Sequence, residues 1–322
     1  MVRDDALDTF LAAQGLSPGD FTFLAGDASN RTYYRARDCL LMDAPPHKGE
    51  DIGPFLHIAR HLRGLNLAAP EIYAADAANG FVLLQDFGDQ LYFDIFAREP
   101  AREQPLYELA LDVLDHLHAA PLPADVPPYQ VDEMTQAAGL ICDWYAPHVP
   151  RADITGPMRD MLGKSDWTSP VLALRDFHAQ NLIWRDGQIG LQAVGLLDFQ
   201  DAQIGHRFYD AMSLIDDARR DIAPPVRHAL LTRVTKGPDQ AQNIFECNVV
   251  SAQRSLRILG VFTRLCLRDG KPHYIDLIPR VWANLWRNLD HPGLEPLVDA
   301  CRALPAPHPE YLNGLRFRCT KS

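Results

Sequence analysis

The chain has 322 residues, of which 47% are hydrophobic and 23% charged, and its formal net charge at pH 7 is −11. This composition is ordinary for a globular protein, and the negative charge argues against a broad nucleic-acid-binding surface, which needs a basic face. The six cysteines include no C-x-x-C pair, which favours reduced thiols in a cytoplasmic protein over a disulfide or zinc framework. The acidic N-terminus lacks the features of a signal peptide, and no apolar run approaches the ~18 residues that cross a bilayer, so no membrane partner is expected.

The first part of the chain, residues 21–87, has the composition of β-strands with one helix between them. Residues 22–46 predict three strands, separated by a tight loop near Gly26 and a turn at Arg37-Asp38. Residues 51–66 carry apolar side chains at helical spacing. Residues 80–87 form a short apolar run that ends in polar residues, which predicts a further strand.

After Gly88 the pattern becomes helical. Residues 106–120 place their leucines on one face of a helix, residues 131–149 form a second helix candidate, and residues 250–289 contain at least two more. We therefore predict an α+β fold with two lobes. The smaller lobe, residues 1–88, is rich in β-strands, and the larger lobe, residues 89–322, is mainly helical.

One stretch of the larger lobe combines apolar and polar residues in an unusual way. In "VLALRDFHAQNLIW", residues 171–184, Asp176 and Asn181 are surrounded by residues typical of a core. Burying a carboxylate without a partner costs several kcal/mol, so a positive ligand such as a metal ion is indicated. Seventeen residues later, Asp198 follows a short apolar strand at 194–197. We expect "NLIW", "IGLQ" and "AVGLL" to form a small hairpin system that brings Asp176, Asn181 and Asp198 together.

These three residues suit phosphoryl transfer. The oxygen atoms of Asn181 and Asp198 are ligands that Mg²⁺ prefers when it also holds a phosphate. Asp176 would then be free to accept a proton from an attacking hydroxyl. The alternative is a capping aspartate next to a buried, hydrogen-bonded asparagine.

The stretch "LRDFHAQNL" followed by "LLDFQDAQIGHRFYD" resembles the aminoglycoside phosphotransferase family, within the protein-kinase-like fold. The resemblance extends from about residue 21 to residue 297 and includes "LAGDASNRTYYR" and "AQRSLRILGVFTRLCLRDGKPHYIDLIPR". These segments are similar to one branch of the family, the kinases that phosphorylate the anomeric hydroxyl of N-acetylmuramate and N-acetylglucosamine in bacterial cell-wall recycling.

The resemblance implies ATP and Mg²⁺ as cofactors and a small-molecule sugar as acceptor. It implies that residues 1–88 bind the nucleotide and that residues 89–322 carry the catalytic and acceptor sites. By the same resemblance, Asp176 is the catalytic base and Asn181 and Asp198 hold the metal. His178 and Asp210 are expected to support the loop structurally, and Asp201 is either a second carboxylate near the metal or a surface residue.

The sequence departs from the usual pattern of this fold at two positions, one in the catalytic loop and one in a strand of the N-terminal lobe. Leu174 stands where the catalytic loop usually has histidine, and Met42 or Asp43 stands where a strand lysine usually binds phosphate. We expect Arg31 and Arg35 to balance the triphosphate instead. The alternative is that both arginines are solvated strand residues.

The remaining nucleotide contacts are expected from a loop and a linker. In "GDASNR" the Ser29 hydroxyl and backbone N–H groups would face phosphate, although the same sequence also suits an ordinary β-turn. The linker between the lobes should contact adenine through residues 84–87, namely Leu84, Gln85, Asp86 and Phe87. Asp86 and Asp89 could bind the ribose, but we expect them to cap the next helix.

The acceptor side is predicted from a short segment and from composition. Only eleven residues separate Asp198 from Asp210, too few for a peptide-docking segment, so no protein substrate is expected. Polar and aromatic residues suited to a sugar are Asp143, Trp144, Tyr145, Asp217, Arg219 and Arg220. Two alternatives stay open: a kinase of another small acceptor, such as an aminoglycoside, an amino alcohol or a different sugar, and a pseudokinase that binds nucleotide without turnover.

Overall fold

The computed structural model describes residues 2–26 and 30–319. Its N-terminal part is a five-stranded antiparallel sheet with the strand order β1-β2-β3-β5-β4. The strands are β1 (Thr22–Gly26), β2 (Thr32–Ala36), β3 (Cys39–Asp43), β4 (Ile72–Asp76) and β5 (Phe81–Gln85). The three strands predicted within residues 22–46 and the strand predicted at 80–87 are therefore confirmed, and β4 is an additional edge strand.

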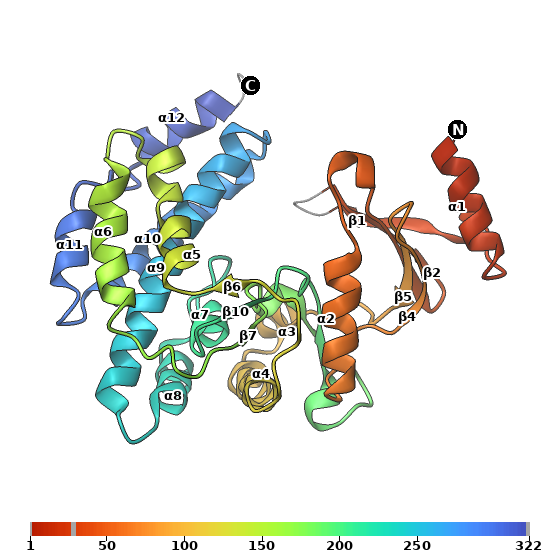
Figure 1. The fold of residues 1–322 in the computed structure, drawn as a ribbon, viewed down its shortest axis with the longest axis horizontal. Helices are drawn as coiled ribbons and strands as arrows, with labels where there is room; N and C mark the ends of the chain where they lie inside the picture. Colours follow the sequence, from red (N-terminus) through yellow and green to blue (C-terminus); the bar gives the residue numbers. More distant parts are fainter. Residues whose placement is uncertain (1, 27–29, 320–322) are drawn as a thin grey trace.

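Helices cover both faces of this sheet. Helix α1 (Val2–Ala12) lies on the outer face and α2 (Gly53–Gly64) lies between the sheet and the rest of the molecule (Figure 1). Because side chains alternate along a strand, neighbouring residues of β3 serve the two faces. Leu41 packs in the small cluster that includes α1 residues, whereas Met42 packs in the main core with α2.

The remainder of the chain is mainly helical. Its helices are α3 (Tyr92–Arg98), α4 (Glu103–His118), α5 (Val131–Ala138), α6 (Arg151–Leu162), α7 (Tyr209–Ile215), α8 (Pro224–Thr235), α9 (Gln240–Leu267), α10 (Ile278–Leu289), α11 (Glu295–Cys301) and α12 (Pro309–Cys319). The single helix expected over 131–149 is instead α5 followed by a separate π-helical segment, η4 (Ile141–Tyr145).

The 28-residue helix α9 is the central support of the helical region, and α5, α6, α7, α8, α10 and α12 all contact it. Figure 1 shows it beside α10, among the surrounding helices. Gly260 allows η4 to approach closely, because a Cβ at this position would lie 2.5 Å from the backbone of Leu140. A larger residue at Gly260 would therefore push the two segments apart.

Two small sheets carry the polar segment singled out in the sequence. Strand β7 (Val171–Ala173) pairs with β10 (Gln203–Gly205), which also pairs with β6 (Pro128–Tyr129). Strand β8 (Leu182–Trp184) pairs with β9 (Val194–Leu196) as a hairpin. The middle segment "IGLQ" is not a strand, since residues 190–193 form a 3₁₀ turn that starts at Gly190 with a φ of +57°.

One hydrophobic core joins the sheet to the catalytic segments. It contains Met42 and Leu84 from the sheet, Tyr92 from α3, and Leu174 and Leu196 from the two small sheets. A second core lies among α5, α6 and α9–α12. The elements that hold Asp176 and Asp198 are thus packed directly against the N-terminal sheet and α2.

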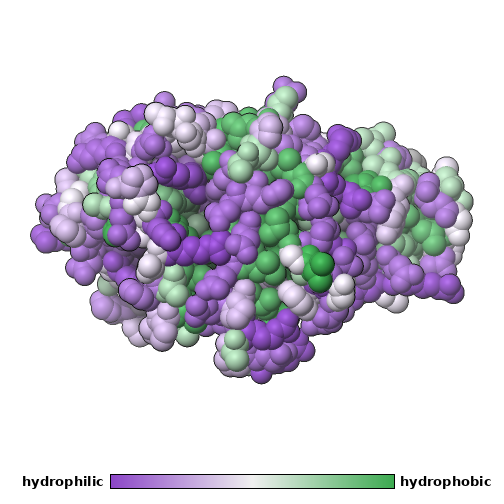
Figure 2. All heavy atoms as spheres, turned by 90° about the horizontal axis from the view of Figure 1, so that it is seen from below, coloured by the Kyte–Doolittle hydropathy of each residue, from purple (hydrophilic) through white to green (hydrophobic). Residues whose placement is uncertain are grey.

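The surface is mostly hydrophilic on the face drawn in Figure 2, where apolar atoms gather mainly toward the middle of the molecule. Within residues 2–26 and 30–319, no helix is both long enough and apolar enough to cross a membrane. The cysteines are free thiols, and all but Cys39 are buried.

Candidate active site

A cavity of about 600 Å³ brings the three predicted chemical residues together. Asp176, Asn181 and Asp198 all line it. The remaining lining comes from Arg31 in the N-terminal part and from the helical region, including a row of residues on α9. The cavity therefore lies where the sheet-containing part of the molecule meets the helical part.

Asp176 follows a residue held in a strained backbone conformation. Arg175 has a φ of +72°, a value that costs a non-glycine residue about 1–3 kcal/mol. Asp210 of α7 stabilises this turn, because its carboxylate accepts hydrogen bonds from the backbone N–H groups of Leu174 (2.6 Å) and Arg175 (2.8 Å). The Ser213 hydroxyl donates to the Arg175 carbonyl (3.3 Å). These contacts determine where the Asp176 side chain enters the cavity.

The burial of Asp210 shapes its ionisation. Burial raises the pKa of this carboxyl to about 6, although the two backbone N–H donors lower it and partly offset the effect. Arg175 is held from its other end, with its guanidinium 4.4 Å above the Tyr129 ring and 2.6 Å from Gln203 Oε1. The turn before Asp176 is therefore fixed through its backbone and through the Arg175 side chain, although Leu174 stands where a histidine was expected.

Asn181 links the other two residues. Its Nδ2 donates to the Asp176 carbonyl (2.9 Å) and to Asp198 Oδ2 (3.3 Å), while Asp198 Oδ1 accepts from Gln200 Nε2 (2.6 Å). Asp198 has a φ of +55°, a second strained residue at the site. With Nδ2 committed to these acceptors, Asn181 Oδ1 makes no hydrogen bond to any described residue.

These oxygen atoms fit a magnesium ion that is also held by phosphate. No group of three His, Cys, Asp or Glu residues in the described part of the chain forms a complete metal cage. Mg²⁺ seldom needs one, because it is usually bound by one or two carboxylates together with substrate phosphates and waters. Asp198 and Oδ1 of Asn181 would supply the protein share of such a site, and Asp201, an exposed residue of the cavity lining, would add negative charge nearby.

Arg31 is the cation that the N-terminal part contributes to the cavity. Its guanidinium is buried and Nε lies 2.9 Å from Glu50 Oε2, while Glu50 Oε1 accepts from the Asn30 backbone N–H (2.9 Å). Burial lowers the pKa of Arg31, but the charges of Tyr33, Glu50 and Asp198 outweigh it and raise the pKa overall. No local pattern indicates Glu50, because its contact with Arg31 depends on how the chain folds back after β3.

Arg35, the second arginine that was expected to balance the triphosphate, is paired with carboxylates outside this cavity. It forms ion pairs with Asp86 (2.6 Å) and Asp89 (2.8 Å) and does not line the cavity. Its expected role in balancing the triphosphate is therefore corrected, because two carboxylates already neutralise it. The preferred role of Asp86 and Asp89 as caps is also wrong, since α3 has no side-chain cap.

The other residues that were predicted to bind the nucleotide lie at the linker between the lobes or outside the described residues. Ser29 falls among residues 27–29, outside the described residues. Leu84 is buried in the core, and the backbone N–H groups of Gln85 and Asp86 already donate to Glu71 (2.8 Å) and Asp38 (3.4 Å). Residues 85–90 line a separate cavity of about 540 Å³, in which Phe87 lies under the Arg185 guanidinium.

Helix α2 contributes to the site through an aromatic contact. Phe55 stacks on Phe199, the residue after Asp198, with ring centroids 5.1 Å apart. Both rings are buried in the main core. The position of Asp198 is therefore tied to the position of α2, a connection between residues far apart in the sequence.

Four of the six predicted acceptor residues do not line the cavity, and three of these four belong to the π-helical segment η4. Tyr145 is fully buried and its hydroxyl donates to the Pro305 carbonyl (2.7 Å). Asp143 pairs with Arg151, and Trp144 does not line the cavity. Their assignment to the acceptor is corrected, because the π-helical segment turns them toward the second core and its surface.

Arg220 is also a structural residue. It bonds Glu103 (2.6 Å) and the Tyr107 hydroxyl (2.7 Å), and its guanidinium lies over the Phe96 ring. By contrast, Asp217 and Arg219 do line the cavity. Burial raises the pKa of Asp217, and its Oδ2 has no partner among the described residues.

His178 is buried rather than solvated, and it lines the same cavity. Burial lowers its pKa well below the usual value, and the charges of Arg219 and Arg254 lower it further, so the imidazole is neutral at pH 7. Nδ1 has no partner within the described part of the chain, whereas Nε2 lies 3.3 Å from Asn181 Nδ2.

The sequence reasoning missed the α9 side of the cavity. Arg254, Arg257, Arg264 and Arg268 all line it. Their spacing of three, seven and four residues was available as a signal, because it places them along one face of a helix. These residues give the cavity a basic wall in an otherwise acidic protein.

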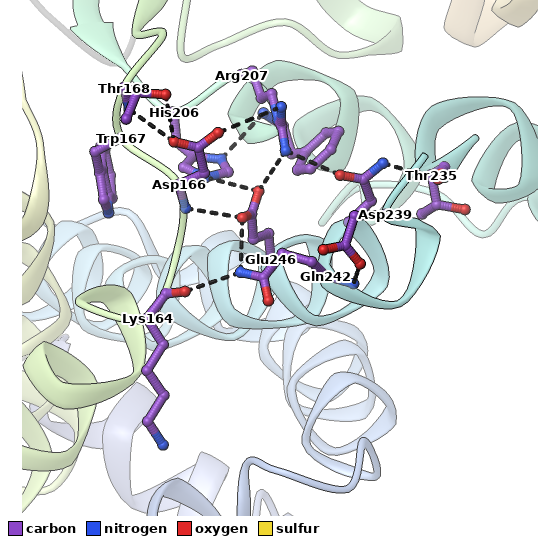
Figure 3. A network of polar contacts seen from close by, with 12 residues as sticks. Lys164, Asp166, Trp167, Thr168, His206, Arg207, Thr235, Asp239, Gln242 and Glu246 are labelled. Carbon is purple, nitrogen blue, oxygen red and sulfur yellow. Dashed lines mark hydrogen bonds and ion pairs between the residues drawn. The ribbon is translucent and has the colours of Figure 1, made fainter. Parts of the chain in front are cut away.

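Buried polar contacts also fasten the segment that follows Asp198. Glu246 of α9 accepts from Arg207 (3.0 Å), from the Asp166 backbone N–H (2.8 Å) and from Gln242 (2.9 Å), and its Oε2 lies 3.4 Å from His206 (Figure 3). Burial would raise the pKa of Glu246, but these donors lower it to about 2. The cluster joins the beginning of α9 to residues on both sides of the active-site strands.

Comparisons with known proteins identify the family and the fold of the chain. Residues 20–243 match the phosphotransferase enzyme family. An N-acetylmuramate/N-acetylglucosamine kinase of Caulobacter vibrioides is 32% identical over 88% of this chain and 91% of its own length. A kinase of the same name from Pseudomonas aeruginosa is also 32% identical, over 88% of each chain.

Solved structures show the same fold at low identity. A choline/ethanolamine kinase family protein from Mesorhizobium loti has a TM-score of 0.62 at 14% identity, with 93% of this chain and 99% of that chain covered. The aminoglycoside phosphotransferase APH(2″)-Ib, solved with ADP bound, has a TM-score of 0.61 at 14% identity, with 88% and 99% covered. The family match spans most of the chain, and the chain belongs to the phosphotransferase enzyme family and is a kinase of that family.

Proposed function

We propose that this kinase transfers the γ-phosphoryl group of ATP to the anomeric hydroxyl of N-acetylmuramate or N-acetylglucosamine. The observation that carries the proposal is the single cavity in which Asp176, Asn181 and Asp198 meet a polar chamber walled by α9. The 32% identity to kinases of these two sugars supports the choice of acceptor. Such a reaction belongs to cell-wall sugar recycling, and we place it in the cytoplasm, where ATP is available.

In the proposed reaction, Asp176 orients the sugar hydroxyl and takes its proton as the oxygen attacks phosphorus. A carboxylate is well matched to this hydroxyl, because the anomeric hydroxyl is the most acidic one of the sugar. Asn181 and Asp198 would hold Mg²⁺, which neutralises charge on the β- and γ-phosphate oxygens when it is bound. The phosphoryl group moves directly from donor to acceptor, with no covalent enzyme intermediate.

Arg31 would supply the positive charge that a strand lysine usually supplies. Its ion pair with Glu50 fixes the guanidinium at the cavity, where its positive charge would act on the phosphate oxygens. The adenine would bind at the linker. Because the N–H groups of Gln85 and Asp86 are already bonded, we expect the contact at Phe87 or the residues after it.

A cationic acceptor, such as an aminoglycoside or an amino alcohol, is the second candidate, favoured by the fold of the solved structures. The α9 wall argues against it, because guanidinium groups repel a polycation in a site of low dielectric. A pseudokinase is disfavoured by the three chemical residues that meet in the cavity.

A panel of acceptors tests the proposal. ATP consumption with Mg²⁺ should be stimulated by N-acetylmuramate and N-acetylglucosamine, and not by kanamycin or choline. Stimulation confined to the cationic compounds would replace the proposed acceptor with the second candidate. No stimulation by any acceptor, with ATP binding intact, would favour the pseudokinase.

A further inference from the structure

The cavity extends beyond the catalytic residues along α9. Arg257 and Arg264, seven residues apart, both face it. Two helical turns separate them, or about 10.5 Å along the axis. Arg257 is within electrostatic reach of the proposed base, because the negative charges of Asp176 and Asp201 act on it, whereas the charges that act on Arg264 are those of Arg268, Asp269 and Arg257. Arg264 therefore marks the part of the chamber that is remote from the reacting hydroxyl.

The arginines of this wall differ in how their charge is compensated. Arg254 donates to the Met212 carbonyl (3.1 Å) and to Ser213 Oγ (2.6 Å). Arg268 forms a two-point ion pair with Asp269 at 2.6 and 2.9 Å. Arg264 has neither kind of partner in the described part of the chain, and its Nε, like that of Arg254, is buried without a hydrogen bond.

The surroundings of Arg264 make this lack of a partner costly. Burial lowers its pKa and the like charges of Arg268 and Arg257 lower it further, while the charge of Asp269 offsets only part of this effect. Buried polar groups in folded proteins are almost always hydrogen-bonded, so an exception calls for a ligand or another explanation. A guanidinium is matched best by a planar carboxylate, which can accept two parallel N–H···O bonds.

We propose that Arg264 is a specificity-determining residue that binds a carboxylate of the acceptor, so that the enzyme prefers an acidic sugar to its neutral counterpart. The inference rests on the proposed function. N-acetylmuramate carries such a group on its lactyl substituent, away from the anomeric oxygen, whereas N-acetylglucosamine has a hydroxyl in its place. The remote position of Arg264 on α9 fits this separation.

Two further buried atoms of the cavity complete an acceptor site for a polar sugar. Asp217 Oδ2 and His178 Nδ1 have no partner among the described residues, and both side chains line the chamber. A carboxylate accepts a hydrogen bond from a sugar hydroxyl, and a neutral imidazole can donate to or accept from a hydroxyl or an acetamido group. Arg264, Asp217 and His178 together therefore match a sugar that carries a carboxylate, hydroxyl groups and an amide.

The test compares two substrates that differ in the carboxylate. We would measure kcat/KM of the wild type and of Arg264→Gln for N-acetylmuramate and for N-acetylglucosamine at saturating ATP. A hydrogen bond to a charged group is worth ~1.5–3 kcal/mol, so the preference for N-acetylmuramate should fall by about 10–100-fold. The loss should appear mainly in KM for that sugar, with the KM for ATP unchanged.

Arg268→Gln is the matched control. It removes the same kind of side chain from the same wall of the cavity, but from a guanidinium that Asp269 already neutralises. The ratio of the two kcat/KM values should stay within about twofold of the wild type. Circular dichroism of each variant would check that α9 remains folded.

A substrate change provides an independent check. The methyl ester of N-acetylmuramate lacks the charge, so the wild type should use it as poorly as Arg264→Gln uses the acid, and the variant should lose nothing further with the ester. If the effects of the Arg264 substitution and of the methyl ester are not additive in this way, Arg264 contacts the carboxylate directly.

Three outcomes would overturn the inference while leaving the proposed function intact: an equal loss of activity toward both sugars, no loss toward either, or a rise in the KM for ATP instead. A wild type that phosphorylates neither sugar would overturn the proposed function itself, and this inference with it.

Discussion

At the scale of single residues, the carboxylate that we propose as the catalytic base depends on a neighbour in a strained conformation. Asp176 is presented to the cavity by Arg175, whose φ of +72° is stabilised by the carboxylate of Asp210. The nearby Asn181 donates to the Asp176 backbone carbonyl and not to its side chain. The Asp176 carboxylate is therefore left available for an acceptor hydroxyl, as a general base requires.

The first prediction concerns this base. Asp176→Asn should leave ATP binding nearly unchanged, because the residue is not expected to contact the nucleotide. Turnover should fall by about 10²–10⁴-fold, the usual contribution of general-base catalysis. Steady-state kinetics and a calorimetric titration with ATP and Mg²⁺ would measure the two effects. A variant with near-normal turnover would show that the role assigned to Asp176 is wrong.

The second prediction compares two cations of the N-terminal part. Arg31→Ala should raise the KM for ATP, because Arg31 lines the cavity and feels the charge of Asp198. Lys48→Ala should leave that KM within about twofold of the wild type, because Lys48 is exposed in a 3₁₀ turn that does not line the cavity. The reverse order in initial-rate measurements would show that Lys48 reaches the nucleotide instead.

At the scale of elements, two helices fix the site from opposite sides. Helix α2 holds the segment after Asp198 through the stacking of Phe55 on Phe199. Helix α9 supplies the basic wall, and its beginning is anchored by the contacts of Glu246 (Figure 3). The stability of these anchors decides whether the chamber keeps its shape.

The third prediction follows from Glu246. Its pKa in the folded protein is about 2, below the ordinary value of 4.5. The ionised form therefore stabilises the fold above about pH 4.5, and this stability is lost as the pH falls toward 2. Glu246→Gln should lower the free energy of unfolding at pH 7 by ~1.5–3 kcal/mol and should weaken the dependence of Tm on pH between 5 and 3.

Denaturant unfolding at pH 7 and thermal scans across this pH range would check the prediction. The exposed Glu310 in the first turn of α12 forms no side-chain hydrogen bond or ion pair with a described residue and provides the control: Glu310→Gln should keep the wild-type pH profile. A Glu246→Gln variant with the same profile would mean that this carboxylate does not drive acid unfolding.

The elements also show which features local sequence can predict. The strands at 22–46 follow from β-branched and aromatic residues bounded by turn residues, and the helix at 51–66 follows from its apolar spacing. The change from α5 to a π-helical segment does not follow from such patterns. This segment packs closely against Gly260 of α9, more than one hundred residues away, and no local pattern contains such a contact.

At the scale of the whole molecule, the functional site lies where one core joins the sheet to the helical region. Met42, Phe55, Tyr92 and Leu174 share this core although they come from distant parts of the chain. The order of a β-rich part and then a helical part could be predicted, since it depends on composition and periodicity alone.

The contents of the site could be predicted only in part, and for a physical reason. Asp176 and Asn181 are close in sequence, so a short loop must keep them close in space. The acceptor candidates around Tyr145 were chosen by residue type, but their position depends on helix packing, which turns Tyr145 into the interior. The same packing brings Arg264 to the cavity from a helix that the sequence reasoning had not connected with the site.

The most direct test of the account is the identity of the phosphorylated atom. ³¹P NMR of a reaction with ATP, Mg²⁺ and N-acetylglucosamine should show a sugar phosphate coupled to the anomeric proton. The methyl glycoside of the same sugar, which has no free anomeric hydroxyl, should give no product, while a 6-deoxy analogue should still react. A phosphate signal on the methyl glycoside would contradict anomeric transfer by this kinase.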